Sequence, residues 1–591
     1  MTAAAGDVAR GRSRGRSASR FPGRSPGRAP SGLVRGGGGG ARWTLAALAL
    51  YVLALCVLPL LRLLVEIGGV EPGAAADILS DRATLRATRH TLEASLGATV
   101  VSLGLGVALA LVLSLVRVPG RAALTFLVLV PMLVPAQIAA LAWLELTGPS
   151  SVLLGALGLA PETGSRNWLY SREGIVLLMG IEHMPIVFLA ARAGLRAVPG
   201  DLVEAARIAG AGPFAIVRRV LLPLSLPMVL AGGALAFVAA VGNFGIPAIL
   251  GIPGRYTMLT ALIYQRLSGF GPSVLGEVAI LSAVLAAIAG LGLLAQAAAE
   301  RRAGAALSGP GGGLAPAALG RTGWVVAAGL ACVLVPISVL PILALLGTSL
   351  VQALGLPLTL ETLTLDHYRT VWDNGAARRA FVNSAWFSAV AAVASLAVAV
   401  PLAWHVVSRR SRLARLLDRA ADAPYALPGI VVSIAFILAF LRPLPVVEVG
   451  LYGTAAIVVL AYLARFLALG LRPVAAAFTA LDPTLEEAAR VAGAGPLTRL
   501  RRVLLPGVAP AAGAGALLIV MSAYNELTVS ALLWSRGNET VGVLVFNLYD
   551  EGDATAASAA SVVAILVTLV AAALVSALSR WLPEGVLPWQ A

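Results

Sequence analysis

Long apolar runs, separated by short polar segments, are the feature that most constrains this chain. Of its 591 residues, 59% are hydrophobic and only 12% are charged, about half the charged share of an average soluble domain. A soluble fold could not hide that much apolar surface behind so few charges. Because a transmembrane helix needs about 20 consecutive apolar residues, the runs predict an all-α polytopic membrane protein.

The runs predict twelve membrane spans in two sets of six. The predicted spans of the first set lie near 43–65, 91–116, 122–145, 174–197, 227–251 and 274–298. Those of the second set lie near 324–350, 382–407, 421–441, 451–476, 510–535 and 557–580. We therefore divide the chain into a tail (1–42), a first module of six spans (43–302), a Gly/Ala/Pro-rich linker (303–322) and a second module of six spans (323–591).

The tail, residues 1–42, carries nine Arg, one acidic residue (Asp7) and many Gly, Ser and Pro. This composition cannot bury a core, so we expect the tail to be disordered and to lie in the cytoplasm beside anionic lipid head groups. Basic Arg- and Gly-rich arms also occur in nucleic-acid binders, but no nucleic-acid partner is expected here. The apolar run that follows is long enough to span a membrane, which argues against a signal peptide.

The placement of arginine predicts the orientation. All 44 basic residues are Arg, and if the N-terminus is cytoplasmic and every run crosses, 31 of the 44 lie on the cytoplasmic side. Positive residues concentrate on the cytoplasmic side of membranes. We therefore expect a multi-pass protein of the bacterial cell (inner) membrane, embedded in the lipid bilayer, with both termini in the cytoplasm.

Several kinds of chemistry are excluded by composition. With no Lys, the chain cannot form a phosphate-binding loop of the G-x-x-x-x-G-K-[ST] type or a Schiff base. Cys56 and Cys332 both lie in apolar runs, and the four His form no metal-binding pattern. We expect no catalytic residue, no metal site and no cofactor. Glu182-His183, inside a predicted span, could be functional or could simply provide polar packing between helices.

Two predicted cytoplasmic loops are near copies of each other. Over Glu204–Pro227 and Glu487–Pro510, 16 of 24 positions are identical without gaps, at an offset of 283 residues. Each loop follows the fourth span of its half. Because an even number of spans separates the loops, the two halves form a parallel repeat related by an axis along the membrane normal.

The start of each loop predicts a capped helix. Asp201 and Thr484 are good N-cap residues, and each is followed three residues later by a glutamate, Glu204 or Glu487. This spacing is that of a capping box, in which the glutamate returns a hydrogen bond to the N-cap backbone.

The end of each predicted helix is marked as well. Gly210 and Gly493 can stop the helix by adopting a left-handed backbone. Pro213 and Pro496 suit the first turn of the helix that follows. We therefore expect, in each loop, a helix of about two turns outside the bilayer; an ordinary connector is the alternative that two matched copies disfavour.

These loops resemble the EAA motif, E-A-A-x-x-x-G-x9-I-x-L-P, of binding-protein-dependent ABC importer permeases. The matching residues are Glu204, Ala205, Ala206, Gly210, Val220, Leu222 and Pro223 in the first half and Glu487, Ala488, Ala489, Gly493, Val503, Leu505 and Pro506 in the second. Val stands in both halves where the motif has Ile. The resemblance covers about residues 43–582 and implies two parallel six-helix repeats of the MetI-like permease type.

The resemblance also implies partners. In this family the short helix is a coupling helix that sits in a groove of the ATP-binding subunit, so Glu204 and Glu487 would face a dimer of ATP-binding cassette subunits. ATP hydrolysis would belong to those subunits, and this chain would not be an enzyme. An extracytoplasmic substrate-binding protein would deliver the substrate, and transport would proceed by alternating access.

Within the family, the chain resembles the fused double permeases of ferric-iron importers. The segments that carry this likeness are Asn243–Gly251, Tyr256–Tyr264, Asn525–Leu527 and Glu539–Val543. Permeases for thiamine, 2-aminoethylphosphonate, sulfate and polyamine are related, so these substrates remain alternatives to ferric iron.

Asn243, Asn525 and Glu526 are candidates for the translocation path. They lie on the predicted fifth span of each half at nearly equivalent depth. The alternative is that they form hydrogen bonds between helices, as polar residues in membrane spans commonly do.

Two other functional classes fit the composition less well. A secondary transporter would need intramembrane carboxylates, and the candidates Glu182, Glu277 and Glu526 do not recur at matched positions of the two halves. A membrane-embedded enzyme would need a nucleophile–base pair or a metal-binding cluster, and no spacing suggests one. Neighbouring genes for an ATPase and a secreted binding protein would separate the importer from both.

The predicted topology places the linker in the cytoplasm and the loop near Gly537 outside. In a chain without its native cysteines, a single Cys near Gly537 should react with a membrane-impermeant maleimide in intact cells. A single Cys near Gly311 should react only after permeabilisation. Labelling of both sites from outside would show the topology to be wrong.

Overall fold

The computed structural model describes residues 38–269, 273–306, 316–443 and 450–578. The chain divides into two units, residues 1–43 and 44–591, and the account below concerns the second. The described residues are helical, apart from loops and two isolated bridges. Most of the predicted tail lies outside them, and α1 begins at Gly38, five residues before the predicted end of the tail.

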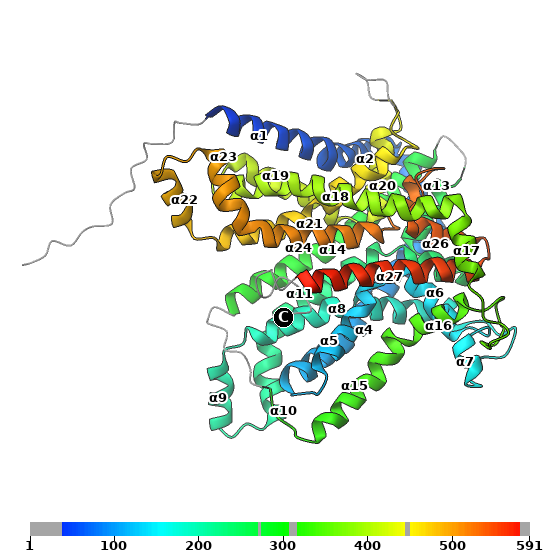
Figure 1. Cartoon of the computed structure of the whole chain (residues 1–591). Coiled ribbons are helices and arrows are strands. Elements are labelled where there is room, and N and C mark those ends of the chain that lie inside the picture. Colours follow the sequence, from blue (N-terminus) through cyan, green and yellow to red (C-terminus); the bar gives the residue numbers. More distant parts are fainter. Residues whose placement is uncertain (1–37, 270–272, 307–315, 444–449, 579–591) are drawn as a thin grey trace, which may run out of the picture. The chain divides into compact units, whose positions relative to one another are not determined.

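The first half contains eight longer helices and several short ones (Figure 1). The longer ones are α1 (Gly38–Tyr51), α2 (Leu58–Gly69), α4 (Arg82–Leu115), α5 (Arg121–Leu133), α6 (Ala136–Thr147), α8 (Arg172–Arg196), α11 (Leu222–Gly242) and α14 (Val274–Ala306). The short ones are α3 (Pro72–Ser80), α7 (Val152–Ala156), α9 (Gly200–Ile208), α10 (Pro213–Ile216), α12 (Ile252–Gly254) and α13 (Leu259–Leu267). A 3₁₀ turn occupies Trp168–Tyr170, and π-helical turns occupy Val52–Val57, Val217–Leu221 and Pro247–Gly251.

The second half repeats this order. Its longer helices are α15 (Thr322–Ser338), α16 (Leu340–Ser349), α18 (Gly375–Val407), α19 (Arg412–Ala426), α20 (Gly429–Phe440), α21 (Ala455–Ala480), α24 (Leu505–Tyr524) and α27 (Ala554–Leu578). Its short helices are α17 (Asp366–Asp373), α22 (Pro483–Val491), α23 (Pro496–Arg499), α25 (Ser530–Leu533) and α26 (Val541–Asp550), with a π-helical turn at Leu500–Leu504.

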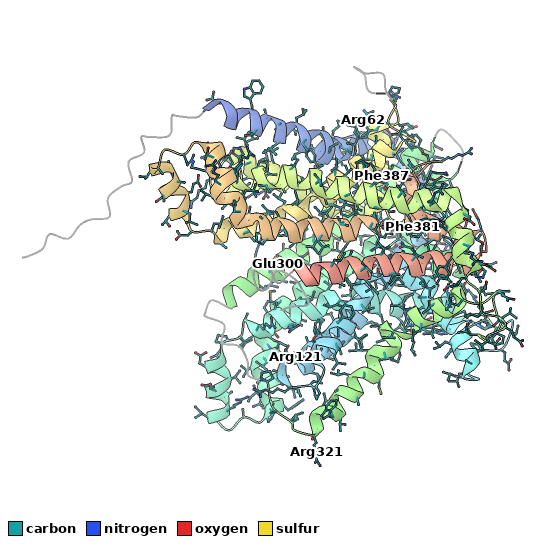
Figure 2. The ribbon with its side chains drawn as sticks, viewed as in Figure 1. Arg62, Arg121, Glu300, Arg321, Phe381 and Phe387 are labelled. Carbon is teal, nitrogen blue, oxygen red and sulfur yellow. The ribbon has the colours of Figure 1, made fainter. Side chains whose placement is uncertain are left out.

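The number of membrane spans agrees with the prediction. Among the described residues, eleven helices are long and apolar enough to cross a membrane, and a bent pair, α19 with α20, makes up to twelve. Charged side chains gather toward helix ends: Glu300 stands in the last two turns of α14 and Arg321 at the start of α15 (Figure 2). The predicted fold class, an all-α polytopic protein of two six-span repeats, is confirmed.

The third predicted span of each half is broken, which corrects the prediction of continuous spans at 122–145 and 421–441. α5 ends before Pro135 and α19 ends before Pro428, and α19 and α20 are bent by 110°. The preceding residues, Val134 and Leu427, are extended, with ψ of 127° and 149°. Proline lacks a backbone N–H and disfavours the helical conformation of the residue before it, so each helix stops there.

The fifth predicted span of each half is shifted. The predicted ranges were 227–251 and 510–535, but the helices begin earlier and end at Gly242 and Tyr524, with Asn243 and Asn525 as C-caps. Both asparagines therefore lie where a helix ends, rather than in the middle of a span.

The packing of the core repeats between the halves. α4, α8 and α11 pack on one another in the first half, and α18, α21 and α24 do the same in the second. The first span of each half packs against the third span of the other half: α2 lies on α20, while α15 and α16 lie on α5 and α6. The Tyr51 hydroxyl donates to the Leu463 carbonyl at 2.9 Å, and the Ser338 hydroxyl donates to the Leu127 carbonyl at 2.8 Å. The halves are thus held together because the first span of each half packs on the other half.

Close helix contact in the first half depends on small residues. A Cβ added at Gly106 of α4 would lie 2.9 Å from the Met184 carbonyl, the Phe188 backbone nitrogen and the Val187 Cβ of α8. Small residues let helix backbones approach in membranes, where packing rather than the hydrophobic effect drives association.

This contact yields a test with a control on the same helix. Gly106→Val should lower the stability of the detergent-solubilised protein by about 1–3 kcal/mol, because the added side chain overpacks the α4–α8 contact. Gly104→Val, two residues earlier with open space around it, should leave the thermal unfolding midpoint almost unchanged. Equal midpoints for both variants would contradict the packing described here.

Candidate functional site

Two short helices, α9 and α22, follow the fourth spans α8 and α21 at repeat-equivalent positions 283 residues apart. Both lie toward the same end of the long helices, while α13 and α26 lie toward the opposite end (Figure 1). Glu204 and Glu487 are exposed on these helices, as are Ala205 and Ala488, while Ala206 and Ala489 are half-buried.

The N-termini of these helices differ from the predicted capping boxes. The N-cap residues are Pro199 and Asp482, so Asp201 and Thr484 lie inside the first turn. Asp482 accepts a hydrogen bond from the Thr484 backbone nitrogen at 2.9 Å, and this bond lowers the pKa of the Asp482 carboxyl. The first helix has no side-chain cap. The prediction was wrong because both helices begin two residues earlier than expected.

The C-termini form as predicted. Gly210 and Gly493 have φ of 81° and 78°, the left-handed region. The Ala211 nitrogen donates to the Ala206 carbonyl and the Gly210 nitrogen to the Arg207 carbonyl, and the second half repeats both bonds. This pair of bonds is a Schellman motif, which requires a left-handed residue that glycine adopts without strain.

Apolar side chains are exposed at equivalent positions of both short helices. Ile208 and Val491 are 88% and 90% exposed, and Leu202 and Leu485 are also exposed. Large apolar side chains displayed on a rigid surface element are typical of an interaction site. Pro223 and Pro506, the last motif positions, are exposed in the first turns of α11 and α24.

The inner sides of the two short helices make different kinds of contact at the same repeat positions, apolar in the first half and ionic in the second. In the first half, Val203 and Ile216 are buried within one apolar cluster. In the second half, Glu486 and Arg499 occupy the equivalent positions and form an ion pair at 3.3 Å. Each short helix is therefore tied to the element that follows it.

A second candidate site is a cavity of about 320 Å³ between the two halves. Four helix interruptions border it: the start of α6, the α19–α20 break, the end of α11 and the end of α24. Irregular backbone is tolerated at membrane depth where it is buried in protein or lines a cavity, and broken helices at matched positions of two repeats point to a binding site.

Polar and charged side chains from both halves line this cavity. The first half contributes Gln137, Glu182, His183 and Asn243, and the second half contributes Tyr425, Arg465, Asn525, Glu526 and Thr528. All three predicted path residues, Asn243, Asn525 and Glu526, are thus brought together, and Glu182-His183 lies with them.

The asparagines also form hydrogen bonds between helices, the alternative role considered from the sequence. Asn243 Nδ2 donates to Glu182 Oε2 at 2.7 Å, and Asn525 Nδ2 donates to the Thr568 hydroxyl at 3.1 Å. The asparagines that line the cavity are therefore held by partners on neighbouring spans, and their part in a translocation path stays a prediction.

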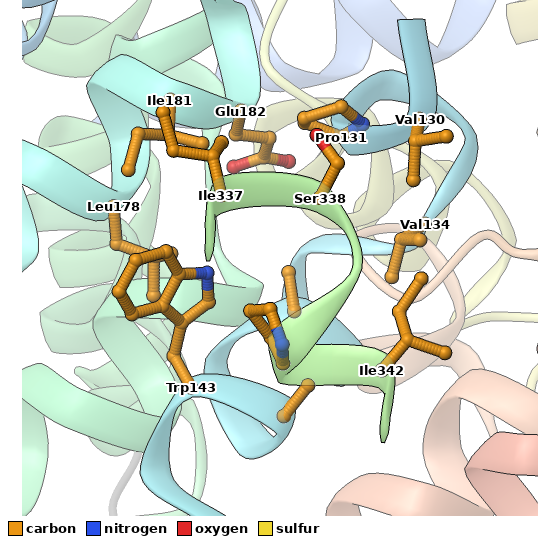
Figure 3. A pocket seen from close by; sticks show the side chains of 13 residues that line it. Val130, Pro131, Val134, Trp143, Leu178, Ile181, Glu182, Ile337, Ser338 and Ile342 are labelled. Carbon is orange, nitrogen blue, oxygen red and sulfur yellow. The ribbon is translucent and has the colours of Figure 1, made fainter. Parts of the chain in front are cut away.

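Glu182 lines two smaller adjoining cavities as well. One, of about 220 Å³, shares Ala136, Glu182 and Asn525 with the cavity of about 320 Å³. The other, of about 30 Å³, lies beside Trp143, and Figure 3 shows the Glu182 carboxylate directed into it between Ile337 and Pro131. The carboxylate therefore stands where three cavities meet.

An aromatic cluster joins the halves beside the main cavity. Tyr264 of α13 and Phe546 of α26 come from opposite halves, and their rings meet edge-on with centroids 5.8 Å apart. Phe244, which lines the cavity, lies 5.2 Å from Tyr264 and 6.0 Å from Phe546. A hydrogen bond of 3.0 Å between the hydroxyls of Tyr170 and Tyr549 also links the halves.

Arg465 is the charged cavity residue that sequence reasoning missed, because it was counted among the 31 cytoplasmic arginines; Gln137, Tyr425 and Thr528 were missed as well. Arg465 Nη1 donates to the Leu427 carbonyl at 3.0 Å, the group left without a helical partner before Pro428. The repeat offset of 283 residues, applied to Glu182, leads directly to Arg465 and could have found it.

Comparison with known proteins identifies the family. The profile described as "Binding-protein-dependent transport system inner membrane component" matches residues 102–303 and again residues 395–587. A probable ABC transporter permease, y4fN of Sinorhizobium fredii, is 30% identical over 80% of this chain and 83% of its own length.

Two further relatives are named for different substrates. The Fe(3+)-transport system permease protein FbpB 2 of Haemophilus influenzae is 23% identical over 89% of this chain and 96% of its own length. A putative 2-aminoethylphosphonate transport system permease, PhnU of Salmonella choleraesuis, is 29% identical over 32% of this chain and 66% of its own length. Because the profile matches twice and the repeat unites both matches, the chain belongs to the ABC importer permeases and is a fused double permease with two inner membrane component domains.

Proposed function

We propose that this chain forms the translocation path of an ATP-driven importer and that α9 and α22 couple it to ATP hydrolysis. The observation that carries the proposal is a connection within each half. α9 joins α8, which carries Glu182, to the segment that ends in α11 at Asn243. α22 joins α21, which carries Arg465, to the segment that ends in α24 at Asn525. A displacement of either short helix would therefore move two walls of the cavity.

The coupling residues are those of the two matched loops. Glu204, Ala205, Ala206, Gly210 and Pro223 would act with Glu487, Ala488, Ala489, Gly493 and Pro506 as the docking surface for a dimer of ATP-binding cassette subunits. Exposed Ile208 and Val491 supply apolar contact there. When two ATPase subunits approach each other on ATP, the two loops would be drawn together, and the packed cores would rock between two arrangements as rigid bodies.

Substrate would reach the cavity from the opposite end. A substrate-binding protein would dock there, near α13 and α26, where the aromatic cluster joins the halves in this conformation. Separation of Tyr264 and Phe546 would open this end, while the coupling loops close the other. The chain would then act as a multi-pass protein of the bacterial inner membrane, with both termini in the cytoplasm and no catalytic residue of its own.

Ferric iron is the substrate we propose for the system. It is supported by the relative FbpB 2, named for Fe(3+) transport, which aligns over almost the whole of both chains. The relative named for 2-aminoethylphosphonate is more similar in sequence but aligns over a third of this chain. Identification of the ligand of the cognate binding protein would decide between them.

A secondary transporter is less well supported by the geometry. Of the three carboxylates considered for that function, Glu277 is paired with Arg266 at 3.1 Å and does not line the cavity. The remaining two, Glu182 and Glu526, do not occupy equivalent positions of the repeat, and the exposed coupling loops would have no role.

Four variants test the coupling loops. Gly210→Val and Gly493→Val should each cost about 1–2 kcal/mol locally, because a β-branched residue is strained in the left-handed conformation, and should misdirect the short helix. Glu204→Arg and Glu487→Arg reverse an exposed charge and should weaken docking directly. The measurements are co-purification of the ATP-binding subunit and ATP-driven uptake, and both should fall for all four variants.

The loops contain matched controls. Gly212→Val and Gly495→Val lie two residues further on, with open space and no left-handed φ, and should retain co-purification and uptake. Normal docking and normal uptake for the four test variants would mean that the loops are simple connectors, and the coupling proposal would fail.

A further inference from the structure

Three charged side chains meet at the main cavity without an ion-pair partner. Glu182, Arg465 and Glu526 all line it, and among the described residues none of them forms a salt bridge. Charged residues within membrane spans are costly and face the bundle interior or a water-filled cavity. Three ionisable side chains that line one cavity and form no ion pair with one another therefore need an explanation beyond packing.

Neutral groups hold each charge in place without compensating it. Glu182 accepts from Asn243 Nδ2, and Glu526 accepts from the Val529 backbone nitrogen, both at 2.7 Å. Arg465 donates from Nη1 to the Leu427 carbonyl, while its buried Nε has no partner. The three side chains are thus oriented in advance and retain unused hydrogen-bonding capacity.

The repeat places opposite charges at the same position. Glu182 on α8 and Arg465 on α21 are separated by the repeat offset of 283 residues, so they correspond to each other in the two halves. Asn243 and Asn525, the C-caps of α11 and α24, border the same cavity. The cavity therefore has a carboxyl, Glu182, from the first half and a guanidinium, Arg465, at the matching place in the second.

We propose that this cavity is a recognition site for a small ligand that presents an oxyanion together with a positive centre. Arg465 would take the oxyanion, since a guanidinium offers several donors matched to carboxylate or phosphate. Glu182, with Glu526, would take the positive centre, which is either the ammonium group of a zwitterion or a metal ion carried with its oxyanion. The volume of about 320 Å³ lies at the small end of ligand pockets.

A bare multivalent cation fits this site less well. Among the described residues, no group of three or more His, Cys, Asp and Glu is arranged to hold a metal ion, and Arg465 would repel an unaccompanied cation. This inference rests on the proposed function, because it assigns recognition to the same path. If ferric iron is the substrate, it implies that the metal passes with an oxyanion.

The test is binding of radiolabelled probes to the purified full-length chain in lipid nanodiscs. The probes are 2-aminoethylphosphonate and ferric citrate, and the single-group controls are ethylphosphonate, ethylamine and iron-free citrate. One of the two probes should bind at least about tenfold more tightly than its single-group controls, a difference of about 1.4 kcal/mol. The probe that does so identifies the source of the positive centre.

Variants assign the two halves of the recognition. Glu182→Gln should abolish the preference of the site for the probe over the control that lacks the positive centre. Arg465→Gln should weaken binding of every oxyanion at least about tenfold, and Arg465→Lys less so because the charge remains. Glu182→Asp, which keeps the charge, should retain the preference, and Glu182→Ala removes the carboxyl if the Gln variant does not fold.

Two controls remove comparable groups elsewhere in the spans. Glu145→Gln changes another buried carboxyl of the first half, which accepts from the Thr348 hydroxyl away from this cavity. Arg472→Gln changes an arginine on the same helix as Arg465, which pairs with Asp418 and Asp422. Neither should alter the binding preference.

The results separate this inference from the coupling proposal. Absence of binding by both probes, or binding that Glu182→Gln and Arg465→Gln leave unchanged, would overturn the recognition site. Co-purification of the ATP-binding subunit should be normal for all cavity variants. Its failure for the wild-type chain would instead overturn the proposed coupling and leave the binding result intact.

Discussion

The need to satisfy every backbone polar group within a membrane governs this structure. Unbroken helices meet that need internally, and each interruption creates free carbonyls and amides that require other partners. Here the interruptions at Pro135, Pro428, Asn243 and Asn525 all border one cavity. Arg465 binds the carbonyl before Pro428, and the Thr260 hydroxyl binds the Asn243 carbonyl at 2.9 Å. Arg465, which binds a carbonyl freed by an interruption, therefore also contributes to the polarity of the cavity.

The same interruptions link the cavity to the short exposed helices. Each of these helices lies between the span that carries a charged cavity residue and the span that ends in a cavity asparagine. The Schellman motif at its C-terminus and the buried contact on its inner side make it a rigid element. Because the connection on each side of the short helix is brief, the coupling proposed above would need no additional element between that helix and the cavity.

Sequence reasoning predicted what depends on periodicity and on local backbone chemistry. It gave the number of spans, the parallel repeat and the left-handed glycines, because apolar length, duplicated motifs and glycine preference are properties of the chain itself. It missed the broken third spans because proline alone does not predict a break. Pro185, Pro401 and Pro473 all lie inside intact helices. Pro131 and Pro135, and Pro424 and Pro428, have the same spacing in both halves, and this repetition was the usable signal.

The candidate site is formed by tertiary contacts, which could not be predicted from the sequence. Asn243, Asn525 and Glu526 were found from their matched depth, but their meeting with Glu182 and Arg465 depends on how the halves pack. The predicted capping boxes were wrong because Ser, Thr and Asp stand near many helix starts. The N-cap residues are Pro199 and Asp482, and the position at which the preceding span ends decides this.

The side chains at the matched positions Glu182 and Arg465 set a limit on the symmetry of the cavity. In a symmetric dimer made from two copies of either half, the position held by Glu182 and Arg465 would carry two carboxylates or two guanidiniums facing each other across the axis. Like charges in such a setting repel and are costly to bury. A pair of opposite sign requires two halves that can mutate independently yet always assemble together in equal number. A single chain that carries both halves meets both conditions, and the two sides of its cavity can therefore differ in charge.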